Sequence, residues 1–346
     1  MALFGGHIKG NANWYKLLLL SAAVIWGLGF VLMKDAVGVV TPSWLLAIRF
    51  GLSGIILAVV FFKKLRAFFT WQHIVYGSLL GVMLFAAFWV QTVGLIYTTP
   101  GKNAFLTASY VVLIPFIHWI VSRKRPSLYN LIAALLCIVG MGMVSLQESL
   151  TFGFGELLTI MSAALFGLHI VYVSKWSTRF DVMVMTVYQF LAASICGILV
   201  GAFTEPLPAL AAVLEPSFVI NMAYLAVFAS SIALAFQNVS LKHVPPAQAS
   251  LFLSMEAVFG VLFSVLIYGE RLGLRLIAGF CLIFIAIVVS ETFPLKKVPW
   301  KRKTEEPPGD QPPSQGAQPR NLEPIAGQPE KLPSKQAATL SQQETT

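Results

Sequence analysis

One ionisable side chain stands out because of where it lies in an apolar sequence. Glu256 occupies the middle of an apolar run, Pro246–Ile267. A charged group at the centre of a membrane costs at least about 2.5–3.5 kcal/mol, so it persists only where it faces protein or a water-filled cavity. Glu256 could take up and release a proton or pair with the amine of a solute. The structural alternative is a hydrogen bond between helices.

Three further side chains could take part in the same chemistry. Tyr110 could hydrogen-bond a solute or hold the Glu256 carboxylate, or it could simply pack. The imidazole of His169 changes charge near neutral pH, which suits a proton relay or a gate, although a structural histidine is equally compatible with the sequence. Arg49 could attract an anionic group or bond to carbonyl groups at a helix end.

Aromatic and amide side chains complete the candidate set. Trp26 and Trp89 could form an aromatic wall around an apolar or cationic solute. Gln91 and Gln237 are expected near opposite membrane faces, where they would make gate contacts or hydrogen bonds between helices. The predicted substrate-contacting residues are Glu256, Tyr110, Trp26, His169, Trp89, Gln91, Gln237 and Arg49.

A serine within a string of small residues offers an enzymatic alternative. Gly51-Leu52-Ser53-Gly54 matches the surroundings of the nucleophile in a rhomboid-type intramembrane serine protease, with His118 or His169 as its base. Small residues are also common where membrane helices pack closely, which favours a structural role for this string. We therefore predict no catalytic residue.

The composition excludes a soluble globular protein. The 346 residues are 57% hydrophobic and only 11% charged, whereas ordinary globular domains are about 25% charged. The net charge of +9 comes from short basic clusters between apolar runs, a distribution typical of membrane orientation signals and not of nucleic-acid binding. The chain contains no phosphate-binding Gly-x-x-x-x-Gly-Lys-Ser/Thr string. The three cysteines fall inside apolar runs without metal-ligand spacing, so we predict neither a cofactor nor a metal site.

Ten apolar runs predict ten transmembrane helices, because a backbone that crosses a membrane must satisfy its own hydrogen bonds. The predicted runs are Tyr15–Met33, Ser43–Phe62, Ile74–Tyr97, Asn103–Ser122, Leu128–Leu146, Gly155–Ser174, Val184–Phe203, Phe218–Asn238, Pro246–Ile267 and Leu274–Thr292. Lysine and arginine alternate between rich and poor loops along this series. The alternation predicts that both termini are cytoplasmic.

The second half of the chain repeats the first. An offset of 146 residues aligns Gln237 with Gln91 and Glu256 with Tyr110, and an offset of 140 residues aligns Phe166 with Trp26. Each half holds five spans, and five is odd, so the second half would enter the membrane from the opposite side. Inverted repeats of this kind are a common architecture of secondary transporters.

The predicted fold is therefore an all-α membrane protein of ten transmembrane helices, arranged as two inverted five-helix repeats. The predicted parts are a cytoplasmic N-terminus (1–14), a first repeat (15–146), a second repeat (155–292) and a disordered cytoplasmic tail (293–346). The tail is predicted from its proline-rich, polar composition, which cannot bury enough apolar surface to fold.

Several short motifs add a resemblance. They are Ala-x-x-Trp-Gly at 23–27, Arg49-Phe50, Gly-Glu-Arg-Leu at 269–272 and Leu-Ile-Ala-Gly at 276–279. In this order, and partly doubled, they resemble the EamA-type members of the drug/metabolite transporter superfamily. The resemblance covers roughly residues 15–292 and implies export or exchange of small metabolites or drugs through a central cavity.

We expect a secondary transporter of the cell membrane that exports or exchanges a small organic metabolite, amino acid-like or drug-like, by alternating access. Its partners would be the small-molecule substrate and the lipid bilayer, with protons as one candidate coupling ion and no nucleic acid. The alternatives are a channel or a non-transporting membrane protein. The sequence does not identify the substrate, the direction of transport or the oligomeric state.

Overall fold

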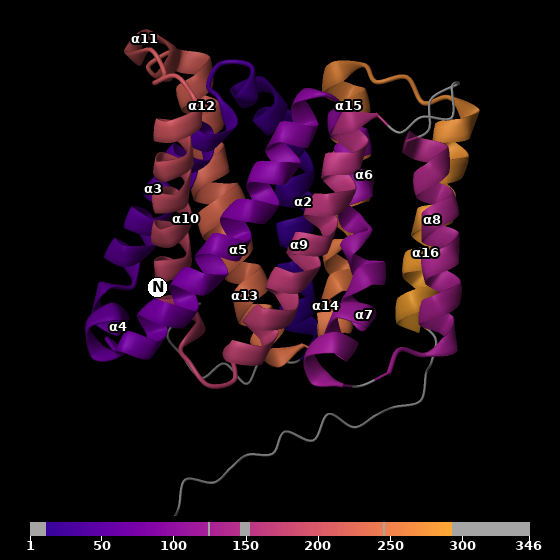
Figure 1. Cartoon of the computed structure of the whole chain (residues 1–346), viewed down its shortest axis with the longest axis horizontal. Helices are drawn as coiled ribbons and strands as arrows, with labels where there is room; N and C mark the ends of the chain where they lie inside the picture. The colour runs from indigo at the N-terminus through magenta and orange to yellow at the C-terminus, as the bar shows by residue number, and fades with distance from the viewer. Residues whose placement is uncertain (1–11, 124, 146–152, 245, 293–346) are drawn as a thin grey trace, which may run out of the picture. The chain divides into compact units, whose positions relative to one another are not determined.

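A computed structural model describes residues 12–123, 125–145, 153–244 and 246–292, and the regular structure within these ranges is helical (Figure 1). The predicted tail, most of the predicted N-terminal segment and the loop at 146–152 lie outside the described residues. The first half contains α2 (Ala12–Val37), α3 (Pro42–Val60), α4 (Phe62–Ala67), α5 (Trp71–Ile96), α6 (Pro100–Ala108), α7 (Tyr110–Ser122) and α8 (Leu128–Ser145). The second half contains α9 (Phe154–Trp176), α10 (Val182–Thr204), α11 (Leu210–Val213), α12 (Pro216–Tyr224), the π-helix η1 (Leu225–Ile232), α13 (Ala233–His243), α14 (Pro246–Leu253), α15 (Met255–Tyr268) and α16 (Leu274–Thr292).

The protein is a helical membrane protein with several spans. Within the described residues, seven helical segments are long and apolar enough to cross a membrane, and three further apolar helices are shorter. The ten crossings that the sequence suggests therefore remain a prediction, although each predicted run falls on one helix or on consecutive helices.

The distribution of side chains is the reverse of that in a soluble protein. Large apolar side chains such as Val59, Ile120 and Leu135 are exposed, at 72%, 74% and 66% of their area, whereas Arg49 and Glu256 are buried. This pattern suits a bundle surrounded by lipid, because hydrocarbon solvates the apolar exterior while protein satisfies the polar groups.

Helices from the two halves of the chain pack against one another throughout the bundle. The contacting pairs are α3 with α10, α5 with α9 and α10, α2 with α13 and α15, α6 with α15, α7 with α9, and α8 with α16. Glycines allow some of these approaches. In α5, a Cβ atom on Gly77 would lie 2.9 Å from the carbonyl oxygen of Met185 in α10.

Two of the predicted spans are broken in the middle. The helix that starts at Pro100 ends at Ala108, and α7 begins at Tyr110. Between them the hydroxyl of Ser109 donates to the carbonyl of Leu106 at 2.6 Å, a local bond that competes with helical backbone bonding. Pro115 lies inside α7, six residues beyond the break.

The second broken span has its break at the matching place. Ser254 separates α14 from α15, as Ser109 separates α6 from α7. Glu256 therefore lies in the first turn of α15 and Tyr110 in the first turn of α7.

The close crossing of α5 and α10 generates the first prediction. Replacing Gly77 by valine should lower the free energy of unfolding by about 1–3 kcal/mol, because the added carbon atoms have no room beside the α10 backbone. The measurement is the thermal unfolding midpoint of the purified protein in detergent. Gly273→Val is the control, because no heavy atom lies within 4 Å of a Cβ built there. Equal midpoints for the two variants would contradict the close crossing.

Candidate functional site

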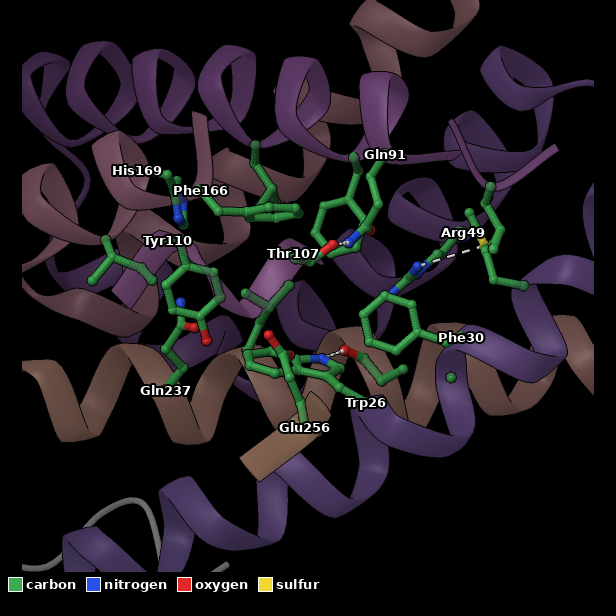
Figure 2. Close-up of a pocket in the computed structure, with 18 residues that line it drawn as sticks. Trp26, Phe30, Arg49, Gln91, Thr107, Tyr110, Phe166, His169, Gln237 and Glu256 are labelled. Carbon is green, nitrogen blue, oxygen red and sulfur yellow. Dashed lines mark hydrogen bonds between the residues drawn. The ribbon is translucent and has the colours of Figure 1, made fainter. Parts of the chain in front are cut away.

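A cavity lies among helices from both halves of the chain. Its empty volume is about 650 Å³ with its open side included, which is an upper bound within the size range of small-molecule sites. The cavity is lined by Trp26, Gly29, Phe30, Met33, Arg49, Leu84, Phe88, Gln91, Leu95, Thr107, Tyr110, Phe166, His169, Ile170, Ala229, Leu234, Gln237 and Glu256 (Figure 2). Its wall is thus mostly apolar and aromatic, with a few separated polar groups.

Seven of the eight side chains predicted from the sequence lie on this cavity, namely Glu256, Tyr110, Trp26, His169, Gln91, Gln237 and Arg49. Gln91 and Gln237, expected near opposite faces of the membrane, line the same cavity. Trp89 is not among the lining residues. Its indole Nε1 instead donates to the hydroxyl of Ser43 at 2.9 Å, which ties α5 to the start of α3.

Glu256 and Tyr110 interact at the two helix breaks. Both side chains are buried, and the Tyr110 hydroxyl is close enough to interact with the Glu256 carboxylate. The carboxylate oxygen Oε1 has no hydrogen-bond partner among the described residues. Glu256 therefore retains an unused acceptor on a cavity that it lines, where it could bind a proton or a donor group of a solute.

Arg49 is a buried cation, 3% exposed, in another part of the cavity (Figure 2). Its Nε donates to the Ser230 hydroxyl at 2.7 Å, and its Nη1 lies 3.8 Å from the sulfur of Met33. The guanidinium carbon is 4.7 Å from the ring centre of Phe88, within the range of a cation–π contact. These contacts orient the guanidinium without neutralising its charge.

The π-helix η1 fixes two of the cavity residues. Its Ser230 accepts the bond from Arg49, and the carbonyl of Ala229 accepts a 2.7 Å bond from Nε1 of Trp26. A π-helix shifts the register of backbone bonding, and short π segments are frequent at functional sites. Here η1 supplies the carbonyl and hydroxyl groups that hold one cationic and one aromatic side chain.

A chain of amide and hydroxyl groups crosses the cavity wall. The side-chain amide of Gln91 donates to the Thr107 hydroxyl at 2.9 Å, and Asn103 donates to the carbonyl of Gln91 at 3.4 Å and to the hydroxyl of Thr159 at 2.8 Å. The chain links α5 and α6 of the first half to α9 of the second. Gln91 thus makes a contact between helices, whereas the side-chain amide of Gln237 donates to its neighbour Asn238 in α13 at 3.4 Å.

His169 is 1% exposed and lies near Gln189. Among the described residues, neither Nε2 of His169 nor the two polar atoms of the Gln189 amide make a well-formed hydrogen bond. Such unsatisfied buried groups are costly. They leave His169 able to contact a solute or water in the cavity.

Ser53 lies in a different environment. Its buried hydroxyl donates to the carbonyls of Arg49 and Ala226, at 2.7 and 2.9 Å. The neighbouring Gly51 and Gly54 lie against Ser194 and Leu191 of α10. The small-residue string therefore packs helices, and the serine has no imidazole partner among the described residues.

Polar contacts join the two halves at the end of the bundle where α6 begins and α15 ends (Figure 1). Within the first half, Lys34 of α2 donates to three backbone carbonyls at and just beyond the end of α5, over 2.6–3.0 Å. Glu270 accepts bonds from the Thr99 hydroxyl and a backbone N–H at the start of α6. Lys102 forms an ion pair of 3.3 Å with Glu156 of α9.

The sequence-based set omitted several cavity residues. Phe166 lines the cavity opposite the position of its repeat partner Trp26, and the alignment of the two halves contained the signal that could have found it. Phe88 and Thr107 carry no such signal, because an isolated phenylalanine or threonine in an apolar helix is ordinary. Ser230 is distant from Arg49 in sequence, so only the tertiary structure reveals their bond.

Comparison with known proteins gives a consistent result. The sequence model of the EamA-like transporter family matches residues 13–146 and again 153–292. A protein of Archaeoglobus fulgidus described as an uncharacterized transporter is 28% identical over 285 residues, which cover 82% of this chain and 88% of the relative. The uncharacterized transporter YvbV of Bacillus subtilis is 25% identical over 284 residues, which cover 80% of this chain and 91% of the relative. A crystal structure with 18% identity superposes with a TM-score of 0.61 over 80% of this chain and 97% of the other, which shows a similar fold.

The bond between Gln91 and Thr107 generates the second prediction. Thr107→Val should lower the free energy of unfolding by about 1–3 kcal/mol, because the buried Gln91 amide loses its acceptor while the side-chain volume is kept. Denaturant unfolding in detergent measures the change. Thr204→Val is the control, because that exposed hydroxyl bonds only within its own helix. A loss no larger than that of the control would contradict the assigned bond.

Proposed function

Because the chain belongs to the EamA-like transporter family, we propose that this membrane transporter is a secondary carrier that exports or exchanges a small organic metabolite by alternating access. The observation that carries the proposal is the cavity, which is buried among helices of both halves and lined by ionisable and aromatic groups. Its substrate-contacting side chains would be Glu256, Tyr110, Trp26, His169, Gln91, Gln237 and Arg49. The cavity would lie near the middle of a cell membrane, and protons are a candidate coupling ion.

The cavity lining supports two related repeats. When the offsets of 140 and 146 residues are applied, twelve of the 18 lining residues fall into six equivalent pairs. The pairs are Trp26 with Phe166, Gly29 with His169, Phe30 with Ile170, Phe88 with Leu234, Gln91 with Gln237, and Tyr110 with Glu256. A site at the interface between repeats is the arrangement expected of a transporter built from inverted repeats.

The packing of the helices supports the same relation. The contacts of α3 with α10 and of α8 with α16 each join two equivalent helices. Other contacts come in equivalent sets, such as α2 with α15 and α9 with α7. In the proposed ten-span topology the two repeats have opposite orientations, so an axis in the membrane plane would relate them.

Alternating access requires that one end of the bundle can close while the other opens. The contacts of Glu270 and Lys102 join the halves at one end. They are hydrogen bonds and one ion pair, which individually contribute little net free energy and can exchange with water. In the proposed orientation they form the closed gate on the non-cytoplasmic side.

The role of Glu256 generates the third prediction. Cells that overproduce the wild-type protein should accumulate its solute in the medium, and Glu256→Gln should reduce that efflux at least tenfold. The amide can neither exchange a proton nor pair with an amine. Metabolite profiles of the medium identify the solute, and flux of that solute into proteoliposomes quantifies the loss.

Glu215→Gln is the matched control for the third prediction, because Glu215 is exposed and its carboxylate bonds only to Ser217. Efflux through Glu256→Gln at the wild-type rate and with the wild-type pH dependence would remove Glu256 from the mechanism. Flux that does not saturate and is not stimulated by solute on the far side would favour a channel.

The proposed topology generates the fourth prediction. Single cysteines at Leu207 and Gly273 should react with a membrane-impermeant maleimide in intact cells, in a background without native cysteines. Cysteines at Ala67 and Thr178 should react only after the cells are permeabilised, because these loops would be cytoplasmic. If one of the positions predicted to be cytoplasmic reacts in intact cells together with one of the positions predicted to be outside, the topology of two inverted five-span repeats is contradicted.

A further inference from the structure

Arg49 is a buried cation that lacks an anionic partner. Among the described residues, the ion pairs are Lys64 with Asp181 and Lys102 with Glu156, and neither includes Arg49. The side chain is 3% exposed and lines the cavity. A buried charge is stable only where it is paired and hydrogen-bonded, so the cavity is one anion short of a neutral arrangement around this group.

The contacts of Arg49 fix its orientation and leave donors free. A guanidinium group has five N–H donors. Nε uses one on the Ser230 hydroxyl, and Nη1 directs another to the Met33 sulfur, which is a weak acceptor. Nη2 has no hydrogen-bond partner in the part of the chain that the structure describes. The face of the group lies against the Phe88 ring, so the unused donors at its edge remain available to a solute.

The surroundings of Arg49 indicate what kind of anion could bind. The planar fork of a guanidinium matches the two oxygens of a carboxylate. The nearby lining is apolar, with Phe30, Met33, Leu84 and Phe88. An anion here would therefore carry an apolar body.

The proposed repeat offers an internal comparison for Arg49. Under the two offsets, Arg49 corresponds to Gln189 and its partner Ser230 corresponds to Leu84. Gln189 is fully buried, and its amide has no hydrogen-bond partner among the described residues. The equivalent position in the second half thus carries no charge, so the buried guanidinium belongs to one half of the proposed repeat alone.

We propose that Arg49 binds the carboxylate of the transported solute, a small organic acid with an apolar body, and that Ser230 is the positioning residue that orients the guanidinium. This inference rests on the proposed transport function, because it assigns a substrate class to the same cavity. Glu256 lies apart from Arg49 (Figure 2). Its unpaired Oε1 would accept an amino group of the solute if the solute carries one.

The test uses the purified full-length protein in detergent and three probes of the same size. They are 3-phenylpropionate, its neutral amide 3-phenylpropanamide, and 3-phenylpropylamine. Binding is followed by the intrinsic tryptophan fluorescence, to which Trp26 on the cavity contributes together with the other seven tryptophans, and by the thermal unfolding midpoint. We expect the acid to bind at least tenfold more tightly than the amide and the amine. Equal binding of acid and amide, or no binding of the acid, would overturn the proposal.

Substitutions at Arg49 and Ser230 test the assigned roles. Arg49→Gln removes both the charge and the fork, and it should abolish the preference for the acid, whereas Arg49→Lys keeps the charge and should only weaken the preference. Ser230→Ala should weaken binding of the acid severalfold and leave binding of the amide unchanged, while Ser230→Thr should restore the preference. The control is Ser231→Ala, because Ser231 lies in the same π-helix but donates to the Ala226 carbonyl. A preference for the acid that survives both Arg49→Gln and Ser230→Ala would contradict the assignment.

Proteoliposome flux separates this inference from the proposed function. One outcome is an acid that binds through Arg49 but shows no saturable flux and no stimulation by solute on the far side. It would contradict the proposed transport function but not the proposed anion site. A solute that is transported with no dependence on its carboxylate or on Arg49 would contradict the anion site and leave transport standing.

Discussion

The structure depends on enclosing ionisable groups within a bundle that is itself surrounded by apolar surface. Glu256 and Arg49 are both almost fully buried, and a charged group facing hydrocarbon would cost several kcal/mol. Because α15 begins at Met255, Glu256 lies in the first turn of this helix, which directly follows Ser254, the residue that separates α14 from α15. The break after Ser109 brings Tyr110 to the equivalent turn of α7.

The bundle contains two kinds of contact between helices, namely close backbone packing and polar contacts at one end. Close crossings such as that of Gly77 with Met185 bring helix backbones together along the bundle, and packing of this kind is hard to deform. The polar contacts that join the halves at one end of the bundle include those of Glu270 and Lys102. In the proposed mechanism the halves would move as packed units while these terminal contacts form and break around the cavity.

Much of the fold and most of the candidate site could be predicted because the apolar background makes each polar residue conspicuous. Glu256, Arg49 and His169 were predicted from type and position, and all three line the cavity. Trp89 was grouped with Trp26 because both are aromatic, but the direction in which a side chain leaves its helix depends on packing. Trp89 bonds to Ser43 instead.

Other features had no local signal in the sequence. The bond between Arg49 and Ser230 joins residues 181 positions apart, and no composition or periodicity marks such a pair. The π-helix at Leu225–Ile232 has an ordinary apolar sequence, because its register is decided by tertiary partners such as Trp26. Proline is the usual cause of a kink, yet Pro115 lies inside α7, and α6 ends near Ser109, whose hydroxyl bonds to the carbonyl of Leu106.

The proposed repeats share a framework but not its charges, and this difference has a physical reason. Arg49 corresponds to the neutral Gln189, and Glu256 corresponds to Tyr110. A fully symmetric site would place two guanidinium groups and two carboxylates in one small, mostly apolar cavity, where like charges repel strongly. One cation and one carboxyl group on different parts of the wall avoid that repulsion. They also present different chemistry to the two ends of a solute, so a site derived from two equivalent halves can still bind its solute in a single orientation.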